Sequence, residues 1–256
     1  MPAIAGLLAT RRQVQVLRRS VPKTGPQVVS CRSFRALDRL MDERMVEAIV
    51  LAPTAAVLDA VAEFRVRFPN VPLVAYAGFR PDDGALLADC YRAGISPALV
   101  AGVDDAILGE SVSRRSLTAA RRRGLAAATR LLRLTEPIQQ QVWEALVVDV
   151  ERPMGTDALA HRFRVSREHL SRQVGAGGAP NLKRLMDLTR TVCAAQLLSN
   201  PGYTIGTVVR LLGYTSSSHL SRTARRVVGV PAKALGALSP AELLQRFVRG
   251  KTRSRI

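Results

Sequence analysis

Residues 204–228 read TIGTVVRLLGYTSSSHLSRTARRVV, and this stretch decides the fold of the second half of the chain. Its regularly spaced apolar positions are Val208, Leu212, Tyr214 and Leu220. They predict two helices, Ile205–Leu212 and Ser216–Val228, each with one apolar face. Gly213 lies between the helices, at a turn that often needs a positive φ. Two short helices joined by such a turn form a helix-turn-helix unit.

A similar pattern lies about 50 residues earlier, in the predicted helices Asp157–Phe163 and Arg167–Val174. Its apolar framework consists of Leu159, Phe163, Val165 and Leu170. Ala160 supplies the small side chain that the helix crossing needs, and Thr156 and Ser166 are expected to cap the two helices. One residue fewer separates its turn from the next buried leucine, so the two units are similar but not identical. A tandem pair is stronger evidence than one unit, because any two packed helices can imitate a single one.

Both second helices present polar side chains on the face opposite their leucines, as a helix that lies in a DNA groove requires. In the first unit the candidate site residues are Ser166, Arg167, Glu168, Ser171 and Arg172. In the second unit they are Ser216, Ser217, Ser218, Ser221, Arg222 and Arg225. Arg172 and Arg222 occupy matching positions, and arginine forks suit both phosphate oxygens and guanine edges. We therefore expect double-stranded DNA as the partner of this surface.

These residues resemble the AraC/XylS class of bacterial transcription regulators. The segments that carry the resemblance are Leu159-Ala160, Val165–Arg172, Leu188–Leu198, Thr204–Arg222 and Gly229-Val230-Pro231. The resemblance covers residues 136–238 and implies a seven-helix domain whose two recognition helices enter successive major-groove segments on one face of the DNA. The chain departs from the family's usual residues at Val209, Leu220 and Ala224.

The rest of the second half also follows helical patterns. The further predicted helices are Pro137–Glu151, Leu182–Leu198 and Glu242–Arg249. Asn200-Pro201-Gly202 is a clear break between helices. Residues 239–256 are expected to form a short helix and a frayed basic tail. The pattern predicts an all-helical domain in which the long helix Leu182–Leu198 joins the two helix-turn-helix units.

The first half alternates between short β-rich runs and helical patterns. The expected strands are Gln13–Leu17, Gln27–Cys31, Glu47–Ala52, Pro72–Ala77 and Ala98–Ala101. Apolar residues spaced as one helical face lie between most of them, for example in residues 34–41 and 57–68. Apolar strands separated by helices form a parallel sheet that is covered on both faces. We therefore predict an α/β domain over residues 1–115.

This strand pattern, with Ala93-Gly94-Ile95 before the fifth strand, resembles the flavodoxin-like receiver domain of response regulators. Phosphorylation in that family needs an acidic pair after strand one, Asp after strand three, a hydroxyl residue after strand four and Lys after strand five. The corresponding residues here are Arg18-Arg19, Ala52, Ala77 and Ala101. The resemblance thus implies a receiver-like domain that is not phosphorylated there and that serves contact or regulation. A homodimer through this domain is a candidate assembly. The sugar-binding β-barrel usual in AraC/XylS regulators is not part of the pattern.

Positive charge is concentrated in the second half. The 256 residues include 38 Lys and Arg and 20 Asp and Glu, which gives a formal net charge of +18. Residues 1–115 carry +3 and residues 116–256 carry +15. Such a field attracts polyanions, so DNA, RNA and an anionic membrane are candidate partners. Residues 116–135 are rich in Arg, Ala and Leu, and they fit either a linker helix with a break at Gly124 or a solvated basic face.

Residues that carry chemistry are scattered. Cys31, Cys90 and Cys193 lie far apart, which favours reduced packing thiols over disulfides or a zinc site. The three histidines lack metal-ligand spacing, and Gly175–Gly178 fits an inter-helix loop better than a dinucleotide loop. Neighbouring motifs do not supply a nucleophile, a base and an orienting group together, so we expect no enzyme, no metal and no cofactor.

No segment has the features of a membrane anchor or a secretory signal. The longest apolar run, Ala48–Leu58, is interrupted by Pro53 and is too short for a bilayer. The N-terminus carries its apolar residues before its charges, the opposite order to a secretory signal. We expect a cytoplasmic, nucleoid-associated protein that does not bind membranes.

Three classes of function remain open. The first is a sequence-specific transcription regulator, for which RNA polymerase is a candidate second partner. The second is an architectural protein whose binding follows salt but not sequence. The third is a signalling protein with phosphoryl or ligand chemistry in the first domain.

Overall fold

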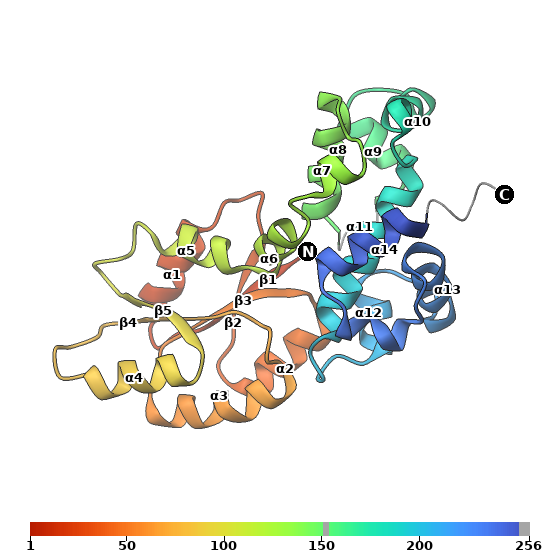
Figure 1. Cartoon of the computed structure of the whole chain (residues 1–256). Helices are drawn as coiled ribbons and strands as arrows, with labels where there is room; N and C mark the ends of the chain where they lie inside the picture. The colour runs from red at the N-terminus through yellow and green to blue at the C-terminus, as the bar shows by residue number, and fades with distance from the viewer. Residues whose placement is uncertain (151–153, 251–256) are drawn as a thin grey trace. The chain divides into compact units, whose positions relative to one another are not determined.

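The computed structural model describes residues 1–150 and 154–250, which form two compact units (Figure 1). Unit 1 comprises Met1–Ala119 together with Asn200–Gly202, and unit 2 comprises Ala120–Ser199 and the chain from Tyr203 onward. Unit 1 is an α/β sandwich and unit 2 is entirely helical, so the predicted fold class is confirmed. Two predicted features, the helix end at Glu151 and the tail beyond Gly250, lie outside the described residues.

Unit 1 is built on a five-stranded parallel sheet. Its strands are β1 (Ala3–Leu7), β2 (Gln27–Ser30), β3 (Val46–Leu51), β4 (Leu73–Ala77) and β5 (Ile95–Val100). Their order is β2-β1-β3-β4-β5, and every neighbouring pair is parallel. This is the order of the flavodoxin-like fold, in which ligands bind beyond the carboxyl ends of the strands.

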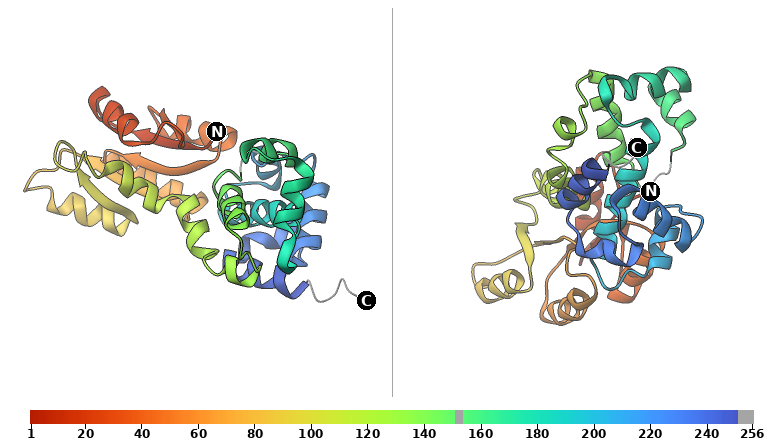
Figure 2. Two further views of the ribbon diagram at one scale, coloured as in Figure 1. Left: turned by 90° about the horizontal axis from the view of Figure 1, so that it is seen from above. Right: turned by 45° about the vertical axis from the view of Figure 1, so that its right-hand side comes forward.

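Helices cover both faces of this sheet (Figures 1 and 2). They are α1 (Arg11–Ser20), α2 (Phe34–Glu43), α3 (Ala55–Arg67), α4 (Gly84–Arg92) and α5 (Leu108–Arg115). On one face, Leu17 of α1 and Leu108 of α5 pack on strand residues such as Val50 and Val74. On the other, Phe34 of α2 and Phe64 of α3 bring their rings within 6.0 Å.

One predicted strand is wrong. Gln13–Leu17 lies inside α1, and the first strand is the N-terminal run Ala3–Leu7. Thr10 and Gln13 form a reciprocal capping box that begins the helix, and only one face of the helix is buried. Two consequences follow. α1 is the crossover that parallel strands require, and the residues after the first strand are Leu8 and Ala9.

The other strand predictions are confirmed, with ends shifted by a few residues. Ala52, Ala77 and Ala101 therefore do follow β3, β4 and β5 directly. With the corrected first strand, Leu8-Ala9, Ala52, Ala77 and Ala101 are the residues that directly follow β1, β3, β4 and β5.

Nine α-helices, drawn green to blue in Figure 1, belong to unit 2 within the described residues, the first of them only in part. They are α6 (Leu117–Gly124), α7 (Ala128–Leu131), α8 (Pro137–Val148), α9 (Thr156–Arg162), α10 (Arg167–Val174), α11 (Leu182–Leu198), α12 (Ile205–Leu211), α13 (Ser217–Val228) and α14 (Pro240–Gly250). Two 3-10 turns, Ala176–Gly178 and Ala232–Ala237, complete it. α11 is the central helix, because it contacts α8, α12, α13 and α14.

The basic stretch 116–135 is neither one linker helix nor a wholly solvated face. It forms the separate helices α6 and α7, and the boundary between the units falls inside α6. Gly124 ends α6 where a Cβ atom would lie 2.8 Å from the Cβ of Pro240, so a larger residue does not fit. Arg121 is fully buried, and it donates to the Val147 carbonyl at 2.6 Å and to Gln196 Oε1 at 2.9 Å. These bonds tie α6 to α8 and α11.

Within residues 1–150 and 154–250, no helix combines the length and the apolar character that a membrane span requires.

Candidate nucleic-acid interface

The first helix-turn-helix unit is formed by α9 and α10. Leu159, Leu170 and Val174 are fully buried, and Ala160 is 3% exposed where the helices meet. Ser166 begins α10 as predicted, because its Oγ accepts from the backbone N–H of His169 at 3.2 Å. The predicted cap of α9 is corrected, since Gly155 holds the cap position and Thr156 is the first helical residue.

The second unit, α12 and α13, repeats this turn closely. Gly213 has a φ of +63°, and Arg164 at the matching place has +56°. After each of them, a backbone N–H reaches back five residues: Val165 to Ala160 at 3.1 Å and Tyr214 to Val209 at 2.9 Å. In both turns, the first helix therefore ends in a residue with left-handed backbone conformation and is closed by the same type of backbone bond.

On α10, the predicted site residues form an exposed polar face. Arg167, Glu168 and Arg172 are exposed, and Ser171 is partly buried. Arg167 lies 3.5 Å from the Glu168 carboxylate and 3.8 Å from that of Asp157. All three side chains are solvent-exposed, so these ion pairs are weak and can yield to a phosphate.

On α13, the predicted residues recur along one face of the helix. Ser217, Ser218, Arg222 and Arg225 are exposed. Ser216 caps the helix, and its Oγ accepts from the His219 N–H at 3.0 Å. Ser221 is partly buried, and its Oγ accepts from the Ala232 N–H at 3.5 Å. Ser221 is therefore less available to a ligand than the sequence pattern indicates.

Residues outside the predicted set, from α11, α13 and the turn, hold α13 and its turn in place. Arg226 of α13 pairs with Asp187 of α11 at 2.7 Å. Arg190 of α11 donates to the Leu212 carbonyl at 2.7 Å, and its guanidinium lies 4.1 Å from the centre of the Tyr214 ring. Burial raises the pKa of Tyr214 to about 12, so its ring stays neutral at physiological pH. The sequence signal that could have pointed to these side chains was the presence of polar residues beside the apolar stripe of a helix.

Gln139 holds the end of α10 in place. It is fully buried in α8, and its Nε2 donates to the carbonyls of Gln173, Val174 and Ala176 at 3.1–3.2 Å. The last carbonyls of a helix have no partner within the helix. A single side chain therefore closes the end of α10 and fixes it to α8.

A profile of the family described as a helix-turn-helix domain matches residues 159–237. Those residues form a helix-turn-helix domain of the AraC type. The chain thus carries the DNA-binding domain of a transcription regulator. No curated protein matches the chain. Full-length FixJ from B. japonicum, a solved structure, is 14% identical over 93% of this chain and 98% of that one, with a TM-score of 0.38. The fold of unit 1 rests on its own strand order rather than on that similarity.

The domain therefore presents two capped helices of the same design. Each begins with a serine at its N-terminus and exposes arginine on its outward face. A helix N-terminus favours a phosphate through its free N–H groups and its dipole. The exposed arginines add charge and hydrogen-bond donors. This arrangement suits contact with a DNA backbone and with base edges in the major groove.

Proposed function

We propose that this chain is a sequence-specific DNA-binding transcription regulator in which α10 and α13 read adjacent major-groove segments. The carrying observation is the repeat of one turn geometry, at Arg164 and at Gly213, within a single helical unit. Each turn holds a second helix with an exposed polar face. The net charge of +15 on residues 116–256 supports an approach to DNA.

Arg172 and Arg222 are the residues proposed to contact bases or adjacent phosphates. Ser166 and Ser216 accept a helix N–H, yet each hydroxyl keeps its own proton for donation to a phosphate oxygen. Arg167, Ser217, Ser218 and Arg225 lie along the same faces. In this proposal the serines position the helices and the arginines discriminate sequence.

The first test is the selection of bound fragments from genomic DNA with the full chain, followed by affinity measurement on the selected site. Arg172→Ala and Arg222→Ala are each expected to weaken specific binding by about 1–3 kcal/mol. Arg130→Ala, on α7, removes the same charge from an exposed position and should leave the affinity nearly unchanged. Unaltered binding by both folded α10 and α13 variants would show that the assignment is wrong.

The salt dependence of binding separates this function from the architectural alternative. A sequence-specific regulator retains a preference for the selected site over scrambled DNA while both affinities fall with salt. An architectural protein binds the selected site and scrambled DNA with equal affinity at every salt concentration. We propose the first outcome, and RNA polymerase as a second partner of the DNA-bound protein in the cytoplasm.

Unit 1 is proposed to serve regulation or homodimer contact without phosphorylation at the receiver positions. Leu8, Ala9, Ala52, Ala77 and Ala101 offer no carboxylate, hydroxyl or ammonium group. Acetyl phosphate with Mg²⁺ is therefore expected to leave no acid-labile phosphate on unit 1 and no change in DNA affinity. Stoichiometric labelling would contradict this. Sedimentation at tens of micromolar tests the dimer.

A further inference from the structure

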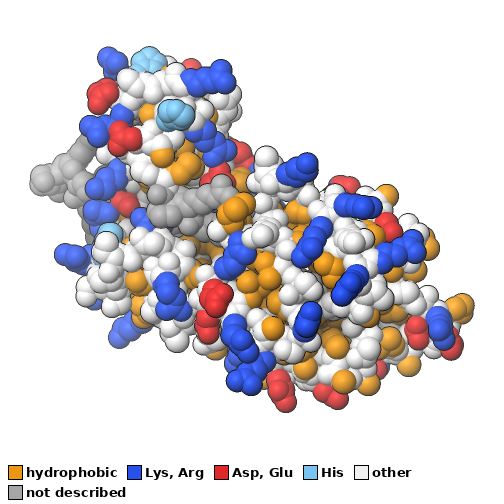
Figure 3. Space-filling model, turned by 180° about the vertical axis from the view of Figure 1, so that it is seen from behind, with side chains coloured by type: hydrophobic (Ala, Val, Ile, Leu, Met, Phe, Trp, Pro, Cys, Tyr) orange, Lys and Arg blue, Asp and Glu red, His pale blue; other side chains and the backbone are white. Residues whose placement is uncertain are grey.

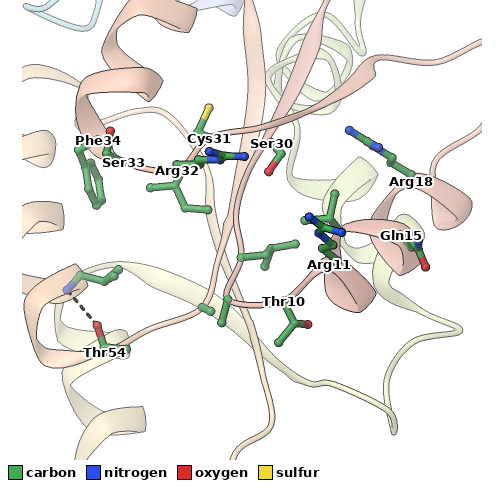
Figure 4. A pocket seen from close by; sticks show the side chains of 16 residues that line it. Thr10, Arg11, Gln15, Arg18, Ser30, Cys31, Arg32, Ser33, Phe34 and Thr54 are labelled. Atoms are coloured by element: carbon green, nitrogen blue, oxygen red, sulfur yellow. Dashed lines mark hydrogen bonds between the residues drawn. The ribbon is translucent and has the colours of Figure 1, made fainter.

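A pocket of about 720 Å³ lies at the carboxyl edge of the sheet in unit 1 (Figure 4). Its walls come from the ends of β1, β2 and β3, from one side of α1 and from the first turns of α2 and α3. β1 lies between β2 and β3, so the crossover connections diverge at this point of the sheet. Flavodoxin-like folds bind ligands at that switch point, and the volume is within the about 300–1,000 Å³ of small-molecule sites.

The charged residues that line this pocket are all basic. Arg11, Arg18 and Arg32 line it, and no lining residue is acidic. In the described part of the chain, none of these three guanidinium groups lies in an ion pair. Figure 4 shows Arg32 extending from the end of β2, with Arg11 and Arg18 on α1 to the other side of Ser30. Figure 3 shows that Lys and Arg side chains are present on both units, so unit 1 has basic surface of its own.

Two of the arginines occupy places that their own helices disfavour. Arg11 is the first residue of α1, directly after its cap Thr10, and Arg32 precedes Ser33, the cap of α2. The cap of α3, Thr54, also lines the pocket. A helix N-terminus carries a partial positive charge, so a cation beside it costs stability. An anion in the pocket would interact favourably with the N-termini of all three helices and with both arginines.

The remaining wall is apolar. Leu8, Val14, Phe34 and Val57 line it, and each is partly buried. We infer that this pocket binds, without covalent reaction, a small molecule that carries a phosphate group and an apolar portion. The arginines and helix N-termini receive the phosphate, and the apolar wall receives the rest. This inference does not rest on the proposed DNA-binding function.

The test uses the full ¹⁵N-labelled chain, titrated with phenyl phosphate, inorganic phosphate and phenol at constant ionic strength. We expect phenyl phosphate to shift the amide signals of residues 9–11 and 32–34, and to bind more tightly than inorganic phosphate. Phenol should leave these signals in place. Arg11→Gln/Arg32→Gln is expected to weaken phenyl phosphate binding about tenfold or more, because two charged hydrogen bonds are lost.

The matched control is Arg19→Gln/Arg39→Gln, which removes two exposed arginines from the same helices outside the pocket. Its binding should equal that of the unaltered chain. The unliganded Arg11→Gln/Arg32→Gln protein should also melt no lower than wild type, since both cations oppose helix dipoles; a structural role would lower the melting temperature. The inference is overturned by equal weakening in both double variants, by signal shifts confined to α10 and α13, or by no shift at all.

Discussion

At the scale of the residue, Arg164 stands where the second turn has glycine. Its φ of +56° lies in the left-handed region, which costs a residue with a Cβ atom about 1–2 kcal/mol. The sequence predicted the positive φ at Gly213 because glycine favours it. An arginine in the equivalent place gives no such signal, although the turn there is closed by the same backbone bond, from Val165 to Ala160.

Arg164→Gly is therefore expected to stabilise unit 2. Glycine removes the strain but adds about 0.4–1 kcal/mol of backbone entropy to the unfolded chain, so the net gain is about 0.5–1 kcal/mol. Urea unfolding followed through Trp143, the chain's only tryptophan and a buried residue of α8, measures it. Gly213→Ala should shift the midpoint in the opposite direction. A lower midpoint for Arg164→Gly would mean that the arginine side chain contributes more than its backbone costs.

At the scale of the element, the helices of unit 2 can be predicted from the sequence, but the side-chain bonds that hold them together cannot. Apolar spacing alone gives α11 as Leu182–Leu198 and places α12 and α13 within a residue of their ends. α1 was mistaken for a strand because Val14, Val16 and Leu17 suit either structure, and only the capping box of Thr10 with Gln13 decides. Contacts such as Gln139 with the end of α10 join residues far apart in sequence, so no local pattern reveals them.

Gln139→Leu is expected to destabilise unit 2 by about 1–3 kcal/mol. The leucine fills a similar volume, but the carbonyls of Gln173, Val174 and Ala176 lose the Gln139 amide as a donor, and the bond to Val174 is buried. Chemical unfolding monitored by circular dichroism measures the change. Gln141→Leu, on the exposed side of the same helix, should alter stability by less than about 0.5 kcal/mol. Equal stability of the two variants would show that the Gln139 bonds contribute nothing net.

At the scale of the whole molecule, charge and fold divide the chain at different places. The basic stretch 116–135 looks like a linker by composition, which puts a natural cut near residue 134. The structure assigns residues from Ala120 onward to unit 2. Leu125 and Leu132 are buried, and Arg121 bonds to α8 and α11. A DNA-binding fragment therefore needs α6 and α7, although both lie outside the matched residues 159–237.

Two fragments test this division. Residues 116–256 are expected to fold and to keep the sequence preference of the full chain, with lower affinity if unit 1 supplies dimer avidity. Residues 134–256 lose two buried leucines, each worth about 1.5–3 kcal/mol, and the Arg121 bonds, so the fragment should unfold at a much lower temperature. Circular dichroism melting and DNA affinity on selected and scrambled sites measure both effects. Equal melting would place α6 and α7 outside the domain. A folded 116–256 fragment that binds all DNA equally would instead favour the architectural function, because specificity would then have to come from unit 1.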